Sequence, residues 1–129
     1  MEELQSFKPK EGNIIASKTF RFALRIVKAY KCLKYEREVY VLSKQLLRCG
    51  TSIGANVHEA LYAQTRADFV TKMSISLKEA SETLYWIELL KESDLFSEAE
   101  SESLKVDCVE IIKMLTTIIK TAKTEQENK

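Results

Sequence analysis

The chain is poor in the residues that interrupt regular structure, because its 129 residues include only three glycines and a single proline. Sandwiches and barrels need a turn signal every few residues, so this scarcity disfavours an all-β fold. Hydrophobic residues make up 45% and charged residues 30%, which is typical of a globular protein and argues against global disorder. The composition therefore favours a single domain over residues 1–129 that is built from helices.

Two further absences bear on location. No apolar run approaches the roughly 18 residues that a membrane span requires, and the charged N-terminus MEELQSFKPKEGN lacks the apolar segment of a signal peptide. The three cysteines are odd in number and show no C-x-x-C spacing, which indicates reduced thiols rather than a disulfide framework. We therefore expect a cytoplasmic protein with no membrane partner.

Histidine is nearly absent, since His58 is the only one in the chain. A ferritin-like di-metal site needs Glu-x-x-His pairs on two helices, and Ser-His triads on helices lack a nucleophile elbow here. A metal site formed by the carboxylates of Glu59, Glu79 and Glu82 alone remains an alternative. In that case the protein would be a small helical enzyme or a metal carrier. Apart from this alternative the sequence predicts no enzyme: no catalytic residue, no metal, no cofactor and no small-molecule substrate.

Apolar residues recur every three or four positions along four segments, which is the period of amphipathic helices. They predict helices at about residues 14–33, 36–62, 66–92 and 98–123. Asn13, Thr65 and Ser97 stand just before three of these segments, and each is a residue type that caps helix N-termini. Four helices of this length with short connections predict an all-α, antiparallel up-down four-helix bundle.

The stretch RCGTSIGANVHEA, residues 48–60, holds two of the three glycines. A phosphate-binding loop would read G-x-x-x-x-G-K-[ST] after a strand, and neither the lysine nor the strand is present. The apolar positions Cys49, Ile53 and Val57 continue the stripe of the preceding residues without a break. The stretch is therefore predicted to be helix interior.

Glycines inside a helix need a compensating contact, because each costs about 1 kcal/mol of helix propensity relative to alanine. Gly50 and Gly54 lie four residues apart and so share one helix face. We expect them to let another helix backbone approach closely. Asn56 falls on the apolar stripe, and we interpret it as a buried amide that fixes helix register.

The same stretch, followed by DFVTKMSISLKEASETLYWIELL, resembles a four-helix-bundle family named for proteins encoded in intervening sequences of bacterial 23S ribosomal RNA genes. The second-helix pattern of that family is R-x-x-x-S-I-x-A-N-I-x-E-[GA], and the third-helix pattern begins D-F. The resemblance spans about residues 7 to 122. The matching positions are Arg48, Ser52, Ile53, Ala55, Asn56, Val57, Glu59, Ala60, Asp68, Phe69, Ile75, Leu77, Glu79, Glu82 and Tyr85. Gly54 departs from the pattern, since many members carry proline there.

The resemblance implies a homo-oligomeric ring, a pentamer, without enzymatic activity. The matched positions Arg48, Ser52, Ile53, Asn56 and Glu59, together with the closely packing Gly50 and Gly54, are predicted to form a structural motif. A related branch contains basic accessory proteins of diversity-generating retroelements, which associate with nucleic acid. The net charge of +1 weakens that second analogy.

Apolar and ionic residues outside the main stripes suggest further contacts. The third and fourth helices carry more apolar residues than one helix–helix contact buries. The additional ones are Phe69, Trp86 and Leu90 on the third helix, and Ile112 and Ile119 on the fourth. We expect them to form a subunit interface, where aromatic residues often concentrate. At the bundle end, an ion pair of Glu59 with Arg48 or Arg66 is a further expectation.

A basic ridge is the candidate nucleic-acid site. Lys18, Arg21, Arg25 and Lys28 step by three and four residues, so at about 100° per residue they share one side of the first helix. No acid interrupts residues 12–35, whereas solvated faces usually mix charges. The leading interpretation is a non-enzymatic homo-oligomeric scaffold with RNA or a ribonucleoprotein as partner. An alternative remains, in which the ridge is an ordinary solvated surface and the protein is a protein–protein adaptor without a nucleic-acid role.

Overall fold

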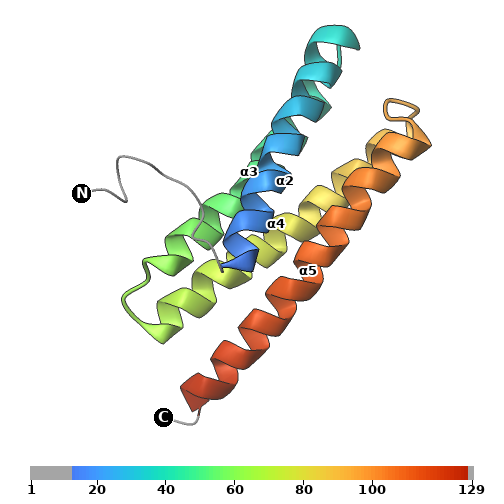
Figure 1. The fold of residues 1–129 in the computed structure, drawn as a ribbon. Coiled ribbons are helices and arrows are strands. Elements are labelled where there is room, and N and C mark those ends of the chain that lie inside the picture. Colours follow the sequence, from blue (N-terminus) through green and yellow to red (C-terminus); the bar gives the residue numbers. More distant parts are fainter. Residues whose placement is uncertain (1–12, 128–129) are drawn as a thin grey trace.

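The computed structural model describes residues 13–127. Its helices are α2 (Ile14–Lys31), α3 (Val41–Leu61), α4 (Arg66–Glu92) and α5 (Glu98–Glu127), and a π-helical turn η1 (Cys32–Glu36) extends α2. Successive helices run in opposite directions (Figure 1), and residues 13–127 contain no strand. The predicted all-α, antiparallel four-helix bundle is confirmed. Most of the N-terminal stretch used to argue against a signal peptide lies outside the described residues.

Local capping fixes the start of three helices. The Asn13 carboxamide oxygen accepts a hydrogen bond from the backbone N–H three residues later, at 3.1 Å, and the Thr65 hydroxyl does the same at 3.0 Å. Ser97 and Glu100 form a reciprocal capping box, each side chain accepting from the other residue's backbone N–H at 3.1 and 2.8 Å. These bonds satisfy N–H groups that have no partner inside the helix.

The predicted start of the second helix at residue 36 is wrong, because α3 begins at Val41. The intervening residues Cys32–Glu36 prolong α2 as a π-helical turn, which closes with a 3.2 Å hydrogen bond from the Arg37 N–H to the Cys32 carbonyl. The chain then reverses through Glu38, whose φ of 57° lies in the left-handed region. A reversal without glycine or proline leaves little signal in the sequence. The last helix also runs on to Glu127, four residues past its predicted end.

The core is formed by the inward stripes of all four helices. Ile26, Leu46, Ile53, Ile87 and Leu115 have no exposed surface. Each helix therefore contributes aliphatic side chains to one continuous core.

Much of the apolar surplus predicted to form a subunit interface belongs to this core. Leu90 is fully buried and Ile119 almost so, while Phe69, Trp86 and Ile112 pack against the core and are partly buried. The interface prediction is wrong for Leu90 and Ile119, because α4 and α5 bury wider faces than a single 3-4 stripe.

The two glycines of α3 face α2, and both contacts are close. A Cβ atom at Gly50 would lie 2.8 Å from two carbons of the Ile26 side chain. At Gly54 it would lie 3.2 Å from the backbone carbonyl oxygen of Thr19. The predicted close approach of another helix backbone is confirmed at Gly54, and at Gly50 the space is taken by a core side chain.

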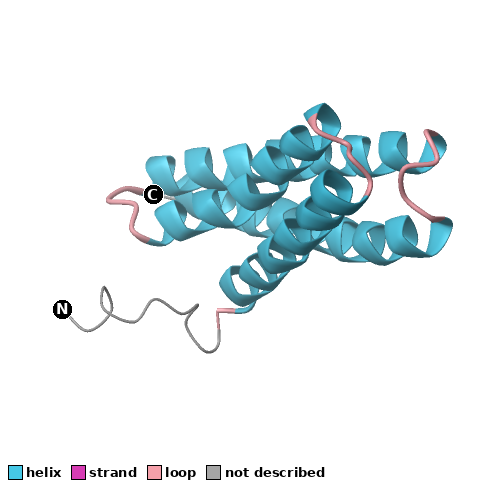
Figure 2. Cartoon of the chain, turned by 90° about the horizontal axis from the view of Figure 1, so that it is seen from above, coloured by secondary structure: helices cyan, strands magenta, loops and turns pink. Residues whose placement is uncertain are grey.

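α2 meets α5 in a different way. Figure 2 shows α2, the helix that follows the grey N-terminal trace, lying obliquely to the other helices. Charged side chains span the seam: Lys18 pairs with Glu110 at 3.0 Å, and Arg25 pairs with Asp107. No helix of the described chain is long and apolar enough to cross a membrane.

Asn56 does not have the role that the sequence predicts. Its side chain is half-buried, and its amide donates to the Ser52 carbonyl one turn earlier in the same helix, at 2.8 Å. A buried cross-helix hydrogen bond comes instead from Ser76, whose hydroxyl donates to the Ile53 carbonyl at 2.8 Å. The prediction fails because the half-buried amide finds its acceptor in its own helix and makes no hydrogen bond to another one within residues 13–127.

Candidate functional site

The predicted basic ridge of α2 divides into two lines. Lys18 and Arg25, seven residues apart, turn toward α5 and form ion pairs there. Arg21 and Lys28, also seven residues apart, are exposed, and no ion pair to either occurs within residues 13–127. Arg21 instead donates to the Ser17 hydroxyl on its own helix. Only half of the ridge is therefore presented to solvent without an acidic partner.

Arg25 is the main polar link between α2 and α5. Besides its ion pair with Asp107, its guanidinium donates to the hydroxyl and the backbone carbonyl of Ser103, at 2.7 and 3.2 Å. All of these acceptors lie on the first half of α5. Arg25 therefore has a structural role in this chain, which sequence spacing alone does not reveal.

At the other end of this seam, Arg37 anchors the turn before α3. Its guanidinium pairs with Glu100 at 2.8 Å and donates to the Leu95 carbonyl at 2.7 Å. The hydrogen bond from Arg37, helped by the Ser97 N–H, lowers the pKa of Glu100 to about 2. Glu100 thus caps α5 and holds the α2–α3 turn at once.

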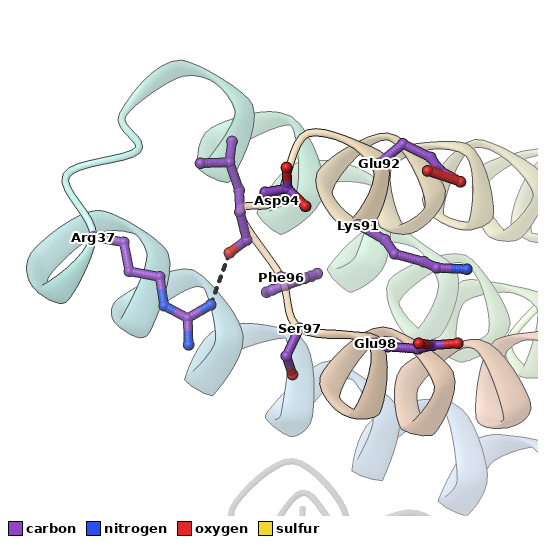
Figure 3. A pocket seen from close by; sticks show the side chains of 8 residues that line it. Arg37, Lys91, Glu92, Asp94, Phe96, Ser97 and Glu98 are labelled. Carbon is purple, nitrogen blue, oxygen red and sulfur yellow. Dashed lines mark hydrogen bonds between the residues drawn. The ribbon is translucent and has the colours of Figure 1, made fainter.

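A pocket of about 630 Å³ lies beside this ion pair, at the loop between α4 and α5. Figure 3 shows Arg37 turned toward the loop backbone, with Lys91 on a neighbouring helix. The pocket is lined by Arg37, Lys91, Glu92, Asp94, Leu95, Phe96, Ser97 and Glu98. Both charge signs line it, and its guanidinium is already hydrogen-bonded to protein acceptors. The pocket is therefore a mixed-charge hollow at the end of the bundle, next to the ion pair that ties the α2–α3 turn to α5.

Arg48 joins α3 to α4 through a second ionic cluster. Its guanidinium reaches Glu79 at 3.3 Å and also bonds to Glu82. The Trp86 indole N–H donates to the same Glu82 carboxylate at 3.0 Å. Next to this cluster, the Tyr85 ring packs edge-on against Trp86, with ring centroids 5.2 Å apart. The result is an aromatic and ionic group along the α3–α4 seam, with the Tyr85 ring exposed beside it.

The three thiols are free, as the sequence predicts. Cys49 and Cys108 are buried, and burial raises the pKa of Cys49 to about 11 and that of Cys108 to about 12. Cys108 donates to the Ala80 carbonyl at 3.3 Å. Thiols held protonated in this way are poor nucleophiles, so these two act as small core residues.

A model of the family described as 23S rRNA-intervening sequence protein matches residues 11–117. The chain belongs to this family. It is also similar to a solved structure, a protein of unknown function from the S23 ribosomal protein family of Bacteroides thetaiotaomicron. The two are 51% identical, with a TM-score of 0.83 over 84% of this chain and 96% of that one. A comparison with curated proteins finds no match.

Several positions that carry the family resemblance meet in space along the α3–α4 seam. Arg48 contacts Glu79 and Glu82, three matched positions from two helices. Ser52 donates to the Arg48 carbonyl at 2.7 Å, so it bonds within α3. The sequence pattern includes these residues but carries no signal that they are partners.

Glu59 has a different partner from the one predicted. It pairs with Lys72 at 3.0 Å, while Arg66 pairs with Glu125 at 3.1 Å. The expected pair of Glu59 with Arg48 or Arg66 is therefore wrong, because α4 brings Lys72 opposite the end of α3.

The same contacts bear on the carboxylate-only metal site that the sequence leaves open. Glu79 and Glu82 share Arg48, whereas Glu59 faces Lys72, so the three acids do not converge. Within residues 13–127, no group of three or more His, Cys, Asp or Glu side chains is placed to hold a metal ion. His58 is half-buried, with its ring 5.2 Å from that of Tyr62, the residue just after the end of α3.

Sequence reasoning missed the large apolar side chains that stay in solvent. Leu24 on α2 is 57% exposed, Tyr85 on α4 61% and Val106 on α5 54%. Phe20 on α2 and Ile75 on α4 are exposed as well. These residues lie off the main stripes, and a search for apolar positions opposite each stripe could have found them.

Proposed function

We propose that this protein is a non-enzymatic helical scaffold that assembles with further copies of itself. The observation that carries the proposal is the pair of exposed apolar faces on α2 and α4. Phe20 and Leu24 stand one turn apart on α2, and Ile75 and Tyr85 are exposed on α4. Single exposed apolar residues are ordinary, but groups of them mark association surfaces.

The buried residues support the non-enzymatic part. The polar side chains inside the bundle are hydroxyls that bond to backbone carbonyls, such as Thr19 to Ile15 at 2.8 Å. Among the described residues, no buried side-chain nitrogen or oxygen lacks a hydrogen-bond partner. An interior whose polar groups satisfy one another favours a structural role over a chemical one.

Light scattering on the purified full chain tests self-assembly. We expect a mass that is a multiple of the 14.8 kDa chain at micromolar concentration. The assembly should persist in 1 M salt, where the Debye length is about 3 Å, because apolar contacts are not screened. A mass of one chain across this concentration range would refute the proposal.

RNA binding through α2 is the second candidate function. Arg21 and Lys28 support it, because both are exposed and no acid lies on α2. Two cations about 10 Å apart along a helix can contact neighbouring backbone phosphates. Arg25 is left out of this site because its guanidinium is already bonded to α5.

A single-stranded RNA oligonucleotide of mixed sequence is the probe for this candidate. Arg21→Glu with Lys28→Glu should weaken binding at low salt and reduce the log–log salt slope by about 1.4, or about 0.7 per lost phosphate contact. The matched control is Lys113→Glu with Lys120→Glu, two exposed lysines with the same spacing on α5. Equal losses in both variants, or no binding by the wild type, would refute an RNA site on α2.

A further inference from the structure

Charge is divided unequally between the two halves of the bundle. Residues 14–61, which form α2, η1 and α3, carry nine Lys or Arg and three Asp or Glu, a net charge of +6. Residues 66–127, which form α4, α5 and their loop, carry eight Lys or Arg and thirteen Asp or Glu, a net charge of −5. The overall charge of +1 therefore conceals a strongly basic half, which attracts polyanions.

Four of the nine cations in the basic half are used inside the chain. They pair with acids of α4 and α5, and they are Lys18, Arg25, Arg37 and Arg48. The other five form no ion pair within residues 13–127, and they are Arg21, Lys28, Lys31, Lys34 and Lys44. The ion pairs between the two halves thus leave a surplus of positive charge on α2, η1 and the start of α3.

Three of these five cations belong to one exposed stripe along α2 and into η1. Arg21, Leu24, Lys28, Lys31 and Tyr35 follow one another at steps of three, four, three and four residues, so they share one side of the helix. All five are exposed, and no acid lies on α2. At 1.5 Å per residue the stripe is about 21 Å long, enough to follow several nucleotides.

The aromatic end of the stripe lies in the α2–α3 turn, at the top of Figure 1. The Tyr35 side chain is 69% exposed. The Lys34 ammonium stands over the rings of Tyr30 and Tyr35, 5.6 and 5.1 Å from their centroids. Exposed rings beside cations are the combination with which proteins hold single strands, since the bases stack on the rings while the cations bind phosphates.

We propose that this stripe binds an unpaired nucleic-acid strand, with one base stacked on Tyr35 and phosphates bound by the three cations of the stripe. The inference rests on the RNA candidate proposed above and deepens it, because it adds a base contact that a duplex cannot make. An anionic membrane is the less suitable polyanion. Its flat surface would also meet the exposed acids Glu36 and Glu38 beside Tyr35, whereas a flexible strand passes them.

Fluorescence anisotropy with a labelled RNA oligonucleotide of mixed sequence, as a single strand and annealed to its complement, tests the base contact on the full chain. Tyr35→Ala should weaken binding of the single strand about tenfold and leave binding of the duplex unchanged. The log–log salt slope should also stay the same, because no phosphate contact is lost. Lys31→Ala should instead reduce that slope by about 0.7.

Two further variants separate stacking from other roles of the tyrosine. Tyr35→Phe should bind like the wild type, since stacking needs the ring and not the hydroxyl. Tyr85→Ala is the matched control, because Tyr85 is 61% exposed but lies on α4, in the acidic half of the bundle. It should leave RNA affinity unchanged.

The outcomes distinguish this inference from the RNA candidate itself. A wild type that binds no RNA overturns both, and if it binds vesicles of phosphatidylserine and phosphatidylcholine, the basic face is assigned to a membrane surface. If Arg21→Glu with Lys28→Glu abolishes binding while Tyr35→Ala has no effect, only the base contact is overturned. Equal losses for single strand and duplex in Tyr35→Ala, or a Tyr35→Phe as weak as Tyr35→Ala, also overturn it.

Folding and mass of each variant are checked by far-ultraviolet dichroism and light scattering. If Tyr35→Ala loses helicity, Tyr35→Leu replaces it with the same expected results, because leucine keeps apolar bulk at this exposed position and has no ring. A Tyr35 variant that loses RNA affinity together with a change in mass assigns the tyrosine to a contact between copies and overturns the base contact.

Discussion

α2 is held to its two neighbours by opposite means. On the α3 side, Gly50 and Gly54 leave room for the Ile26 side chain and the Thr19 backbone. On the α5 side, Arg25 reaches across to Asp107 and Ser103 with its long side chain. One side is a close-packed, buried contact and the other is a partly exposed ionic seam.

This difference separates contacts that set geometry from contacts that adjust it. Interior packing is as dense as an organic crystal, so an added side chain at the α3 side has nowhere to go. Charged side chains at the α5 side are flexible and partly solvated, so their loss leaves the helices in place. We therefore expect substitutions at the two seams to differ severalfold in free energy of unfolding.

The largest effect is expected at Gly54. Gly54→Leu should destabilise the protein by about 1–3 kcal/mol or more, because the side chain overpacks against the Thr19 carbonyl. Gly54→Ala should lie within about 1 kcal/mol of the wild type, since its gain in helix propensity offsets a tight 3.2 Å contact. Urea unfolding at one protein concentration measures both. Equal midpoints for the two variants would contradict close packing at this seam.

A smaller effect is expected for the Arg25–Asp107 pair. A double-mutant cycle with Arg25→Met and Asp107→Asn should give a coupling energy of about 0.2–1 kcal/mol, because both side chains are roughly one-third exposed. The coupling should shrink in 1 M salt, where the Debye length is about 3 Å. A coupling that does not change with salt would show that this seam is held by packing.

The smallest effect concerns the pH dependence of the Arg37–Glu100 pair. The pKa of Glu100 is lowered from 4.5 to about 2, so its stabilisation is present above pH 4.5 and is lost as the pH falls toward 2. The Glu100 side chain is 38% exposed, so solvent screening limits the contribution of the pair to about 0.5 kcal/mol.

Arg37→Met should therefore reduce the stability that is lost between pH 4.5 and 2. Part of this pH dependence should remain, because the hydrogen bonds with Ser97 also lower the pKa of Glu100. Urea midpoints of the wild type and the variant over this pH range measure the difference. Parallel curves would mean that the guanidinium does not set this pKa. Lys113→Met serves as the control, because Lys113 is exposed on α5 and no ion pair to it occurs within residues 13–127.

Local patterns were sufficient for much of the fold. Helical periodicity identified all four helices, and the caps Asn13, Thr65 and Ser97 placed three of their starts. The failure at Val41 has a local cause as well, since a π-helical turn and a left-handed Glu38 carry no glycine or proline signal. The two-glycine face was also readable, because glycine inside a helix lowers stability unless a close contact offsets the loss.

The sequence by itself determined the helical period, the capped ends and the family, because these depend on neighbours within a few residues or on a matched motif. Only the tertiary structure decided which charges are used inside the chain. Lys18 and Arg25 read the same as Arg21 and Lys28 in sequence, yet a difference in angle around α2 turns one pair to α5 and leaves the other in solvent. The pairing of Arg48 with Glu79 and Glu82 likewise depends on tertiary structure. These partners are more than thirty residues from Arg48, and the rotation and crossing of α3 and α4 bring them together.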